Sequence, residues 1–241
     1  MKDKNVFFNP FRLISPTLDS EASRIEELYE TPPTDVTCLE EGLLVMCSKL
    51  IEMTDCVRKS LIVTDQGKMA KCEMLGKEIH DEEKGLTGDL VCYPDTKGDV
   101  LKAIVLFPGR LERVGDLIES ILNVSRIKSR DGIPFSDKAL KELTELFSLF
   151  TEALRTFRDV LLNRNQTVLE ALLKQQDKLA QMTIDFGLAH EDRLLEGLCS
   201  PKASSLYLDI LDSVKNANAH IKDMSEILLR LANSPQAGRS N

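Results

Sequence analysis

Hydrophobic residues recur every three or four positions along most of the 241-residue chain, the spacing that places them on one face of an α-helix. The clearest example is a single apolar stripe near the start, formed by Leu39, Leu43, Met46, Leu50, Met53, Val57 and Leu61. No alternating pattern of useful length indicates a β-strand. The sequence therefore predicts an all-α protein.

The apolar pattern divides into six long helices. They are expected at about 38–64, 68–90, 99–127, 136–161, 166–198 and 201–233. Ser200 followed by Pro201 is a typical helix start, because the serine side chain caps a backbone N–H and proline needs no partner for its missing one.

The six helices form two similar sets of three. A shift of 107 residues aligns the third helix with the sixth and matches Asp116 to Asp223 and Glu119 to Glu226. A shift of 110 aligns the second helix with the fifth and matches the histidines at 80 and 190. The sequence therefore predicts two tandem three-helix bundles related by a pseudo-twofold repeat. The domains expected are an N-terminal extension (1–35), a first repeat (36–132), a second repeat (133–233) and a flexible tail (234–241).

Charge and composition narrow the function classes. The chain has 31 Lys and Arg against 39 Asp and Glu, a net charge of −8, which argues against nucleic acid or an anionic membrane as the main partner. Its longest apolar run, residues 103–107, is far shorter than the roughly 20 residues that span a bilayer. The start is broken too early for a signal peptide, and the six cysteines are spread singly. We expect a soluble, cytoplasmic protein with reduced thiols.

The third predicted helix carries a row of carboxylates. Glu112 and Asp116 are four residues apart and share one face, and Glu119 continues that face one turn later. Like charges at this spacing repel each other unless a cation lies between them. Oxygen-rich faces suit hard or borderline cations, and a histidine improves the affinity for iron or zinc. Through the repeat, Asp223 and Glu226 join these residues as candidate metal ligands.

A second group of candidate ligands lies on the second and fifth helices. His80, Asp81 and Glu83 form one part, and His190 and Glu191 form the other. Glu83 falls within an apolar stripe, where an unpaired carboxylate would be costly, so it should meet a cation or lie at the edge of the bundle.

A simpler interpretation remains open for both groups. The acidic row is also what a solvated helix face looks like, with Arg113 paired to Asp116. For His80 and His190, an exposed or hydrogen-bonded side chain is more common than a metal ligand, before the repeat is considered. Gly115 costs about 1 kcal/mol relative to alanine inside a helix, which indicates a close approach to the backbone there.

Other chemistries are poorly supported by the sequence. It contains no glycine-rich phosphate loop, no G-x-S-x-G and no H-E-x-x-H motif. The Glu-x-x-His motif of di-iron helical bundles is missing as well. We do not expect an enzyme.

The motif Leu-Glu-Arg-Val-Gly-Asp at residues 111–116 resembles the Leu-Glu-Arg-Ile-Gly-Asp signature of the PhoU family of phosphate-transport regulators. The resemblance covers residues 36–233 as two three-helix repeats, and it extends to PhoU-like domains fused behind sodium–phosphate cotransporters. In the second repeat Ala219 and Lys222 stand where the signature has Glu and Gly, while Asp223 remains.

The resemblance implies clusters of iron or zinc on acidic helix faces. It also implies that phosphate uptake and signalling are restrained by contact with a phosphate transporter component, a sensor kinase or both. The expected function is therefore a non-enzymatic regulator of phosphate transport and phosphate homeostasis, with no nucleic-acid partner and no membrane insertion; a homodimer is compatible with the sequence. The alternatives are a helical interaction scaffold without metal and, third, a carboxylate-bridged metalloenzyme, which would need carboxylates and histidines converging inside the bundle.

Overall fold

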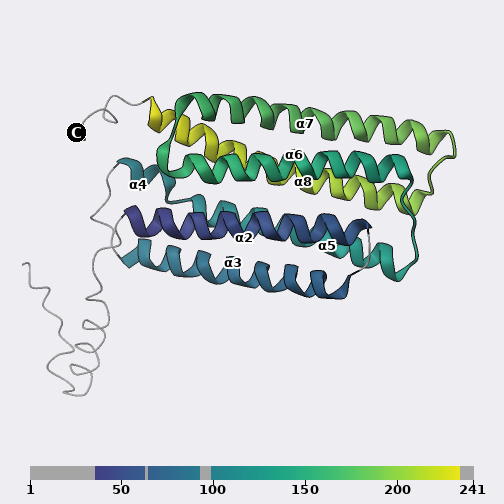
Figure 1. The fold of residues 1–241 in the computed structure, drawn as a ribbon, viewed down its shortest axis with the longest axis horizontal. Coiled ribbons are helices and arrows are strands. Elements are labelled where there is room, and N and C mark those ends of the chain that lie inside the picture. Colours follow the sequence, from purple (N-terminus) through teal and green to yellow (C-terminus); the bar gives the residue numbers. More distant parts are fainter. Residues whose placement is uncertain (1–35, 63–64, 93–98, 234–241) are drawn as a thin grey trace, which may run out of the picture. The chain divides into compact units, whose positions relative to one another are not determined.

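The computed structural model describes residues 36–62, 65–92 and 99–233. These residues form six long helices and one short one and contain no strand, so the all-α prediction is confirmed (Figure 1). The helices are α2 (Val36–Ile62), α3 (Gln66–Cys92), α4 (Asp99–Ile104), α5 (Phe107–Arg130), α6 (Asp137–Asn163), α7 (Gln166–Leu195) and α8 (Pro201–Ala232). The predicted N-terminal extension (1–35) and tail (234–241) lie outside the described residues.

The helices of the second half begin at side-chain caps. Ser136, Asn165 and Ser200 each precede a helix, and each side chain accepts a hydrogen bond of 3.1–3.2 Å from the backbone N–H three residues further on. Such a cap satisfies a donor that has no partner within the helix, and its loss costs about 1 kcal/mol. The start predicted from Ser200 and Pro201 is confirmed.

The helices are arranged as two sets of three. Helices α2, α3 and α5 pack against one another, and so do α6, α7 and α8. The two sets meet through α2 against α6 and α5 against α8. Figure 1 shows α3 and α7 on the two outer sides. In the two sets, α2 corresponds to α6 and α5 to α8. Because each of these helices packs against the one it corresponds to, the arrangement has the predicted pseudo-twofold repeat. The domain boundary at residue 132 stays a prediction.

The predicted apolar stripes form the core. All seven residues of the stripe in α2 are buried, none with more than 2% of its surface exposed. Phe107 of α5 and Phe157 of α6 are also fully buried, with ring centroids 6.4 Å apart, so they join the two sets of helices. Large aromatic side chains of this kind contribute much of the buried apolar area in a core.

The third predicted helix is interrupted. Residues 99–104 form α4, residues 107–130 form α5, and the chain turns between them. Pro108 lies at the start of α5. A proline ring collides with the carbonyl four residues earlier, here that of Ile104, which explains why the helix ends there.

The register of the repeat differs from the sequence prediction. Helices α2, α3 and α4 begin at residues 36, 66 and 99, and α6, α7 and α8 begin at 137, 166 and 201, which is 100 to 102 residues later. Helix α5 has ten buried residues. When 103 is added to their numbers, nine of them match buried residues of α8, whereas adding 107 matches only five. The predicted shifts of 107 and 110 are therefore wrong by one turn or more.

Candidate functional site

The acidic residues of α5 face α3 across a shallow cavity. Glu112, Asp116 and Glu119 line it from α5, and His80 lines it from α3. The cavity has a volume of ≈ 320 Å³, and Gly76, Lys77, Ile79 and Gly115 complete its wall. Four of the ten residues predicted as metal ligands are thus brought to one place, which we call the α3–α5 acidic face.

His80 and Glu112 form the direct contact of this face. His80 Nδ1 lies 2.9 Å from Glu112 Oε1, and 49% of the histidine side chain and 24% of the glutamate side chain are exposed. Since a carboxylate only accepts hydrogen bonds, the proton of this bond is on Nδ1. In the neutral ring, Nε2 then has a free lone pair, and a carboxylate on the other nitrogen is the usual orienting partner of a metal-binding histidine.

The other two carboxylates are close together and incompletely neutralised. Burial, and then the charge of Glu112, raise the pKa of Asp116 above its ordinary value. Burial raises the pKa of Glu119 in the same way, followed by the charges of Asp116 and Glu73. A raised carboxyl pKa means that the charged form is disfavoured, which a bound cation would reverse.

Two glycines allow the helices to approach at this face. A Cβ atom added to Gly76 would overlap the carboxylate of Glu119, so this glycine provides the space in which Glu119 lies. A Cβ on Gly115 would meet Ile79 and Leu50 at 3.6–3.7 Å, an ordinary contact distance. The close approach expected at Gly115 is therefore found at Gly76 instead.

The donor types of the acidic face suit iron or zinc, which accept imidazole nitrogen together with carboxylate oxygen. Their present positions do not complete a site. Among the residues that the structure describes, no group of three or more His, Cys, Asp or Glu side chains converges closely enough to hold an ion. Binding there requires Asp116 or Glu119 to move into range of His80.

Asp81 and Glu83 lie apart from this face. Asp81 lines a different cavity, of ≈ 580 Å³ between α2 and α3, together with Lys49, which forms ion pairs with Glu78 at 3.3 Å and Glu82 at 3.2 Å. Glu83 is half-buried and accepts a hydrogen bond of 2.8 Å from Thr87. Glu83 thus lies at the edge of the bundle, one of its two expected situations.

The predicted ligands of the second repeat are not brought together. His190 stacks against Tyr207 of α8, with ring centroids 4.3 Å apart. Asp223 lies sixteen residues further along α8, about 24 Å away at 1.5 Å per residue, and accepts a hydrogen bond of 2.6 Å from Arg110. Glu226 lies three residues beyond Asp223 on α8, and the exposed Glu191 directly follows His190 in the sequence.

The corrected register explains this separation. At a shift of 103, the positions equivalent to Glu112, Asp116 and Glu119 are occupied by two lysines and an alanine: Lys215, Ala219 and Lys222. The acidic row of the first repeat therefore has no copy in the second.

The sequence interpretation missed a buried polar cluster in the second repeat, formed by Glu142, His190, Arg193 and Tyr207. Arg193 donates two hydrogen bonds to the Glu142 carboxylate, at 3.0 and 2.7 Å, and the Tyr207 hydroxyl donates a third at 2.6 Å. Burial and the charge of Arg193 lower the pKa of His190. Burial and the neighbouring carboxylate raise the pKa of Tyr207.

A sequence signal for this cluster did exist. Glu142 is three residues after the buried Ala139 and four before the buried Leu146, so it lies on the apolar face of its helix. An unpaired carboxylate on an apolar face is costly, so Glu142, like Glu83, should meet a cation, and here that cation is Arg193.

None of the described helices is long and apolar enough to cross a membrane. No protein-family model and no curated protein matches the chain. Among solved structures, it is similar to the crystal structure of PhoU from Pseudomonas aeruginosa, with a TM-score of 0.74, 14% identity, and coverage of 80% of this chain and 95% of that one. It is also similar to the phosphate transport system regulatory protein PhoU from Streptococcus pneumoniae, with a TM-score of 0.72, 14% identity, and coverage of 81% and 93%. The chain therefore has the PhoU fold.

Proposed function

We propose that this chain is a PhoU-like, non-enzymatic regulator of phosphate transport and phosphate homeostasis, and that it acts by contact with other proteins in the cytoplasm. The observation that carries the proposal is the agreement between the fold and the sequence motif. The fold is that of a phosphate transport regulatory protein over four fifths of the chain. The motif at residues 111–116, which resembles the family signature, lies on α5, the third long helix of its repeat.

In this proposal the α3–α5 acidic face binds iron or zinc. His80 would offer Nε2 while Glu112 orients its ring, and Asp116 and Glu119 would supply further carboxylate oxygens. The ion would supply positive charge. Neutralised carboxylates on two neighbouring helices would fix the packing of α3 against α5, and that surface is what a partner would recognise.

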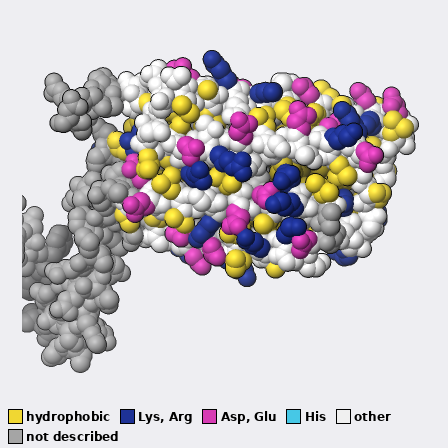
Figure 2. Space-filling model, viewed as in Figure 1, with side chains coloured by type: hydrophobic (Ala, Val, Ile, Leu, Met, Phe, Trp, Pro, Cys, Tyr) yellow, Lys and Arg dark blue, Asp and Glu magenta, His cyan; other side chains and the backbone are white. Residues whose placement is uncertain are grey.

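The partners that fit this role are a phosphate transporter component, a sensor kinase or both. On the side of the molecule seen in Figure 2, Lys and Arg side chains alternate with Asp and Glu over short distances. A mixed surface of this kind supports a protein partner more than nucleic acid, which needs a continuous basic footprint.

A metal-free helical scaffold is the second candidate. One observation favours it: the described residues contain no preformed group of three ligands. A carboxylate-bridged metalloenzyme has weaker support, because the acidic face lies at the surface rather than inside the bundle.

Elemental analysis of purified protein separates these candidates. Glu112→Ala combined with Asp116→Ala removes two carboxylates from the face. Asp192→Ala combined with Glu196→Ala is a matched control, because this pair has the same spacing and is exposed at the end of α7. We expect iron or zinc in the wild type and the control and its loss from the first variant. Equal metal content in all three proteins would exclude the acidic face as the site.

The regulatory role is tested separately. Cells that lack the chain should take up labelled phosphate faster than wild-type cells when external phosphate is abundant, and restoring the chain should slow the uptake. Unchanged uptake with and without the chain would contradict the proposed function.

A further inference from the structure

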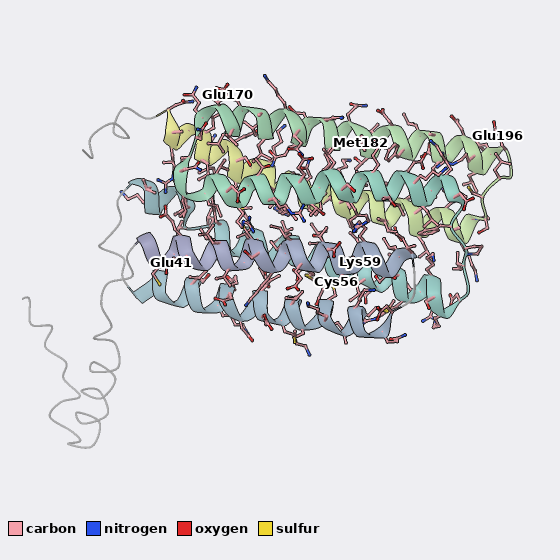
Figure 3. All side chains as sticks on the ribbon, viewed as in Figure 1. Glu41, Cys56, Lys59, Glu170, Met182 and Glu196 are labelled. Atoms are coloured by element: carbon pink, nitrogen blue, oxygen red, sulfur yellow. The ribbon has the colours of Figure 1, made fainter. Side chains whose placement is uncertain are left out.

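We propose that the second repeat contains a binding site for a small carboxylate with an apolar body, at the end of the bundle where α6 and α8 begin. This is the end at which Figure 3 labels Glu196. The site is distinct from the α3–α5 acidic face, and the inference does not depend on the proposed regulatory function.

The site is a cavity of ≈ 230 Å³. Its apolar wall consists of Pro134, Phe135, Ala139, Leu198 and Ala203. Its polar wall consists of Ser136, His190, Cys199 and Ser200. A cavity that is mainly apolar with a few convergent polar groups is the usual form of a small-molecule site.

One wall residue is a buried donor without a partner. Only 2% of His190 is exposed, and its Nε2 atom is buried and makes no hydrogen bond within the described residues. Its other ring nitrogen, Nδ1, lies 3.3 Å from a guanidinium nitrogen of Arg193. A guanidinium only donates hydrogen bonds, so Nδ1 accepts and the proton of the neutral ring is on Nε2.

The ring is held in this state by its neighbours. Arg193 is itself fixed by two hydrogen bonds to Glu142, and the imidazole stacks on Tyr207 at a centroid distance of 4.3 Å. Burial and the charge of Arg193 lower the pKa of the imidazole, which favours its neutral form. Leaving such a buried N–H without an acceptor costs free energy, because the group has lost its water and gained no partner. His190 therefore presents a fixed donor that needs an acceptor.

The two serines of the polar wall are also donors. Ser136 and Ser200 are the N-caps of α6 and α8, and each side-chain oxygen already accepts a backbone N–H, which leaves its hydroxyl hydrogen to donate. Two helix N-termini meet at this cavity, and both favour negative charge. The buried charge of Glu142 is compensated by Arg193. The wall therefore selects an anionic acceptor.

The apolar wall decides which anion fits best. Inorganic phosphate has four oxygens, and those that lie against Phe135 and Leu198 rather than at the donors would lose water without a compensating hydrogen bond. A short carboxylate instead places its two oxygens at His190 and the serines and its hydrocarbon part against the apolar residues. Butyrate has this shape and is the probe we choose, with an expected dissociation constant of about 1 mM for so small a ligand.

Cys199 provides the readout, because it lines the cavity and is partly exposed. Butyrate should slow the alkylation of Cys199 by N-ethylmaleimide, followed by peptide mass spectrometry of the full chain. The exposed Cys38 is the internal control and should react at an unchanged rate. Inorganic phosphate and sodium chloride at equal ionic strength should protect Cys199 much less. Equal protection by all three salts, or protection by phosphate alone, would overturn the proposal.

Three variants test the assignment of the donor. His190→Phe retains the stack on Tyr207 and removes the N–H, so butyrate affinity should fall roughly ten- to hundredfold. His190→Gln keeps an N–H donor near the same place and should retain more of the affinity. Ala203→Leu fills the cavity without changing a polar group and should abolish protection, even if the histidine variants fold poorly. Undiminished protection of Cys199 in a folded Ala203→Leu protein would contradict the site.

Discussion

The pair formed by Glu142 and Arg193 allows a quantitative test of the structure. Arg193→Met removes a guanidinium that donates two hydrogen bonds to a carboxylate with only 4% of its side chain exposed. Removing one partner of a buried ion pair costs about 3–5 kcal/mol, because the remaining charge is left uncompensated. The Tyr207 hydroxyl at 2.6 Å and the exposed Lys138 at 3.6 Å still stabilise Glu142. We therefore expect a loss near the lower limit, about 3 kcal/mol.

A second variant isolates the cost of the uncompensated charge. When Glu142→Met is combined with Arg193→Met, no charge is left buried, and the apolar side chains fill similar space. The double variant should lose only about 1 kcal/mol, mainly because the Tyr207 hydroxyl has no acceptor. Urea unfolding of wild type, both single variants and the double variant, followed by circular dichroism, gives the coupling energy. An Arg193→Met loss below about 1 kcal/mol, or a double variant as unstable as that single variant, would refute the buried pair.

Three further predictions follow from other residues. Gly76→Ala should raise the free energy of unfolding, measured in urea titrations, by up to about 1 kcal/mol, because alanine favours the helix and the flexible Glu119 carboxylate can move aside. A loss of stability would show that the Glu119 carboxylate cannot move. Cys38 should be alkylated readily at pH 8, whereas Cys47, whose burial raises its pKa to about 12, should stay unmodified in peptide mass spectra; equal rates would contradict this. The raised pKa of Asp116 means that the folded state binds its proton more tightly than the unfolded chain, so this group favours folding more as the pH falls through that pKa. As the pH falls from 7 to the ordinary Asp value of 3.8, Asp116→Asn should therefore gain less stability than wild type, and equal gains would argue against the raised pKa.

The helices could be predicted because their apolar residues follow one spacing over many turns. Every residue of the α2 stripe is buried, as expected from its sequence. The break before α5 was not predicted, although Pro108 was the signal for it. The register of the repeat could not be obtained in this way, because a slip of four residues is about one helical turn and preserves the apolar pattern. Only the packing of the helices distinguishes a shift of 103 from one of 107.

Only the part of the candidate site that lies within one helix could be predicted from the sequence. Glu112, Asp116 and Glu119 share one face because of their spacing within α5, so this part can be predicted from one helix alone. The contact of His80 with Glu112 depends on how far α3 is displaced along α5, which no pattern within one helix determines. His190 was grouped with His80 because both precede acidic residues, yet its surroundings are set by Tyr207 and Arg193 on other turns and helices.

One measurement in cells tests whether the acidic face carries the regulatory role. Labelled phosphate uptake would be measured, with abundant external phosphate, in cells whose only copy of the chain carries Glu112→Ala and Asp116→Ala. Cells with the Asp192→Ala and Glu196→Ala control would be measured beside them, and equal amounts of folded protein would be verified in both. We expect fast, unrestrained uptake with the first variant and wild-type uptake with the control. Wild-type uptake in both would contradict the claim that the α3–α5 acidic face is the functional surface.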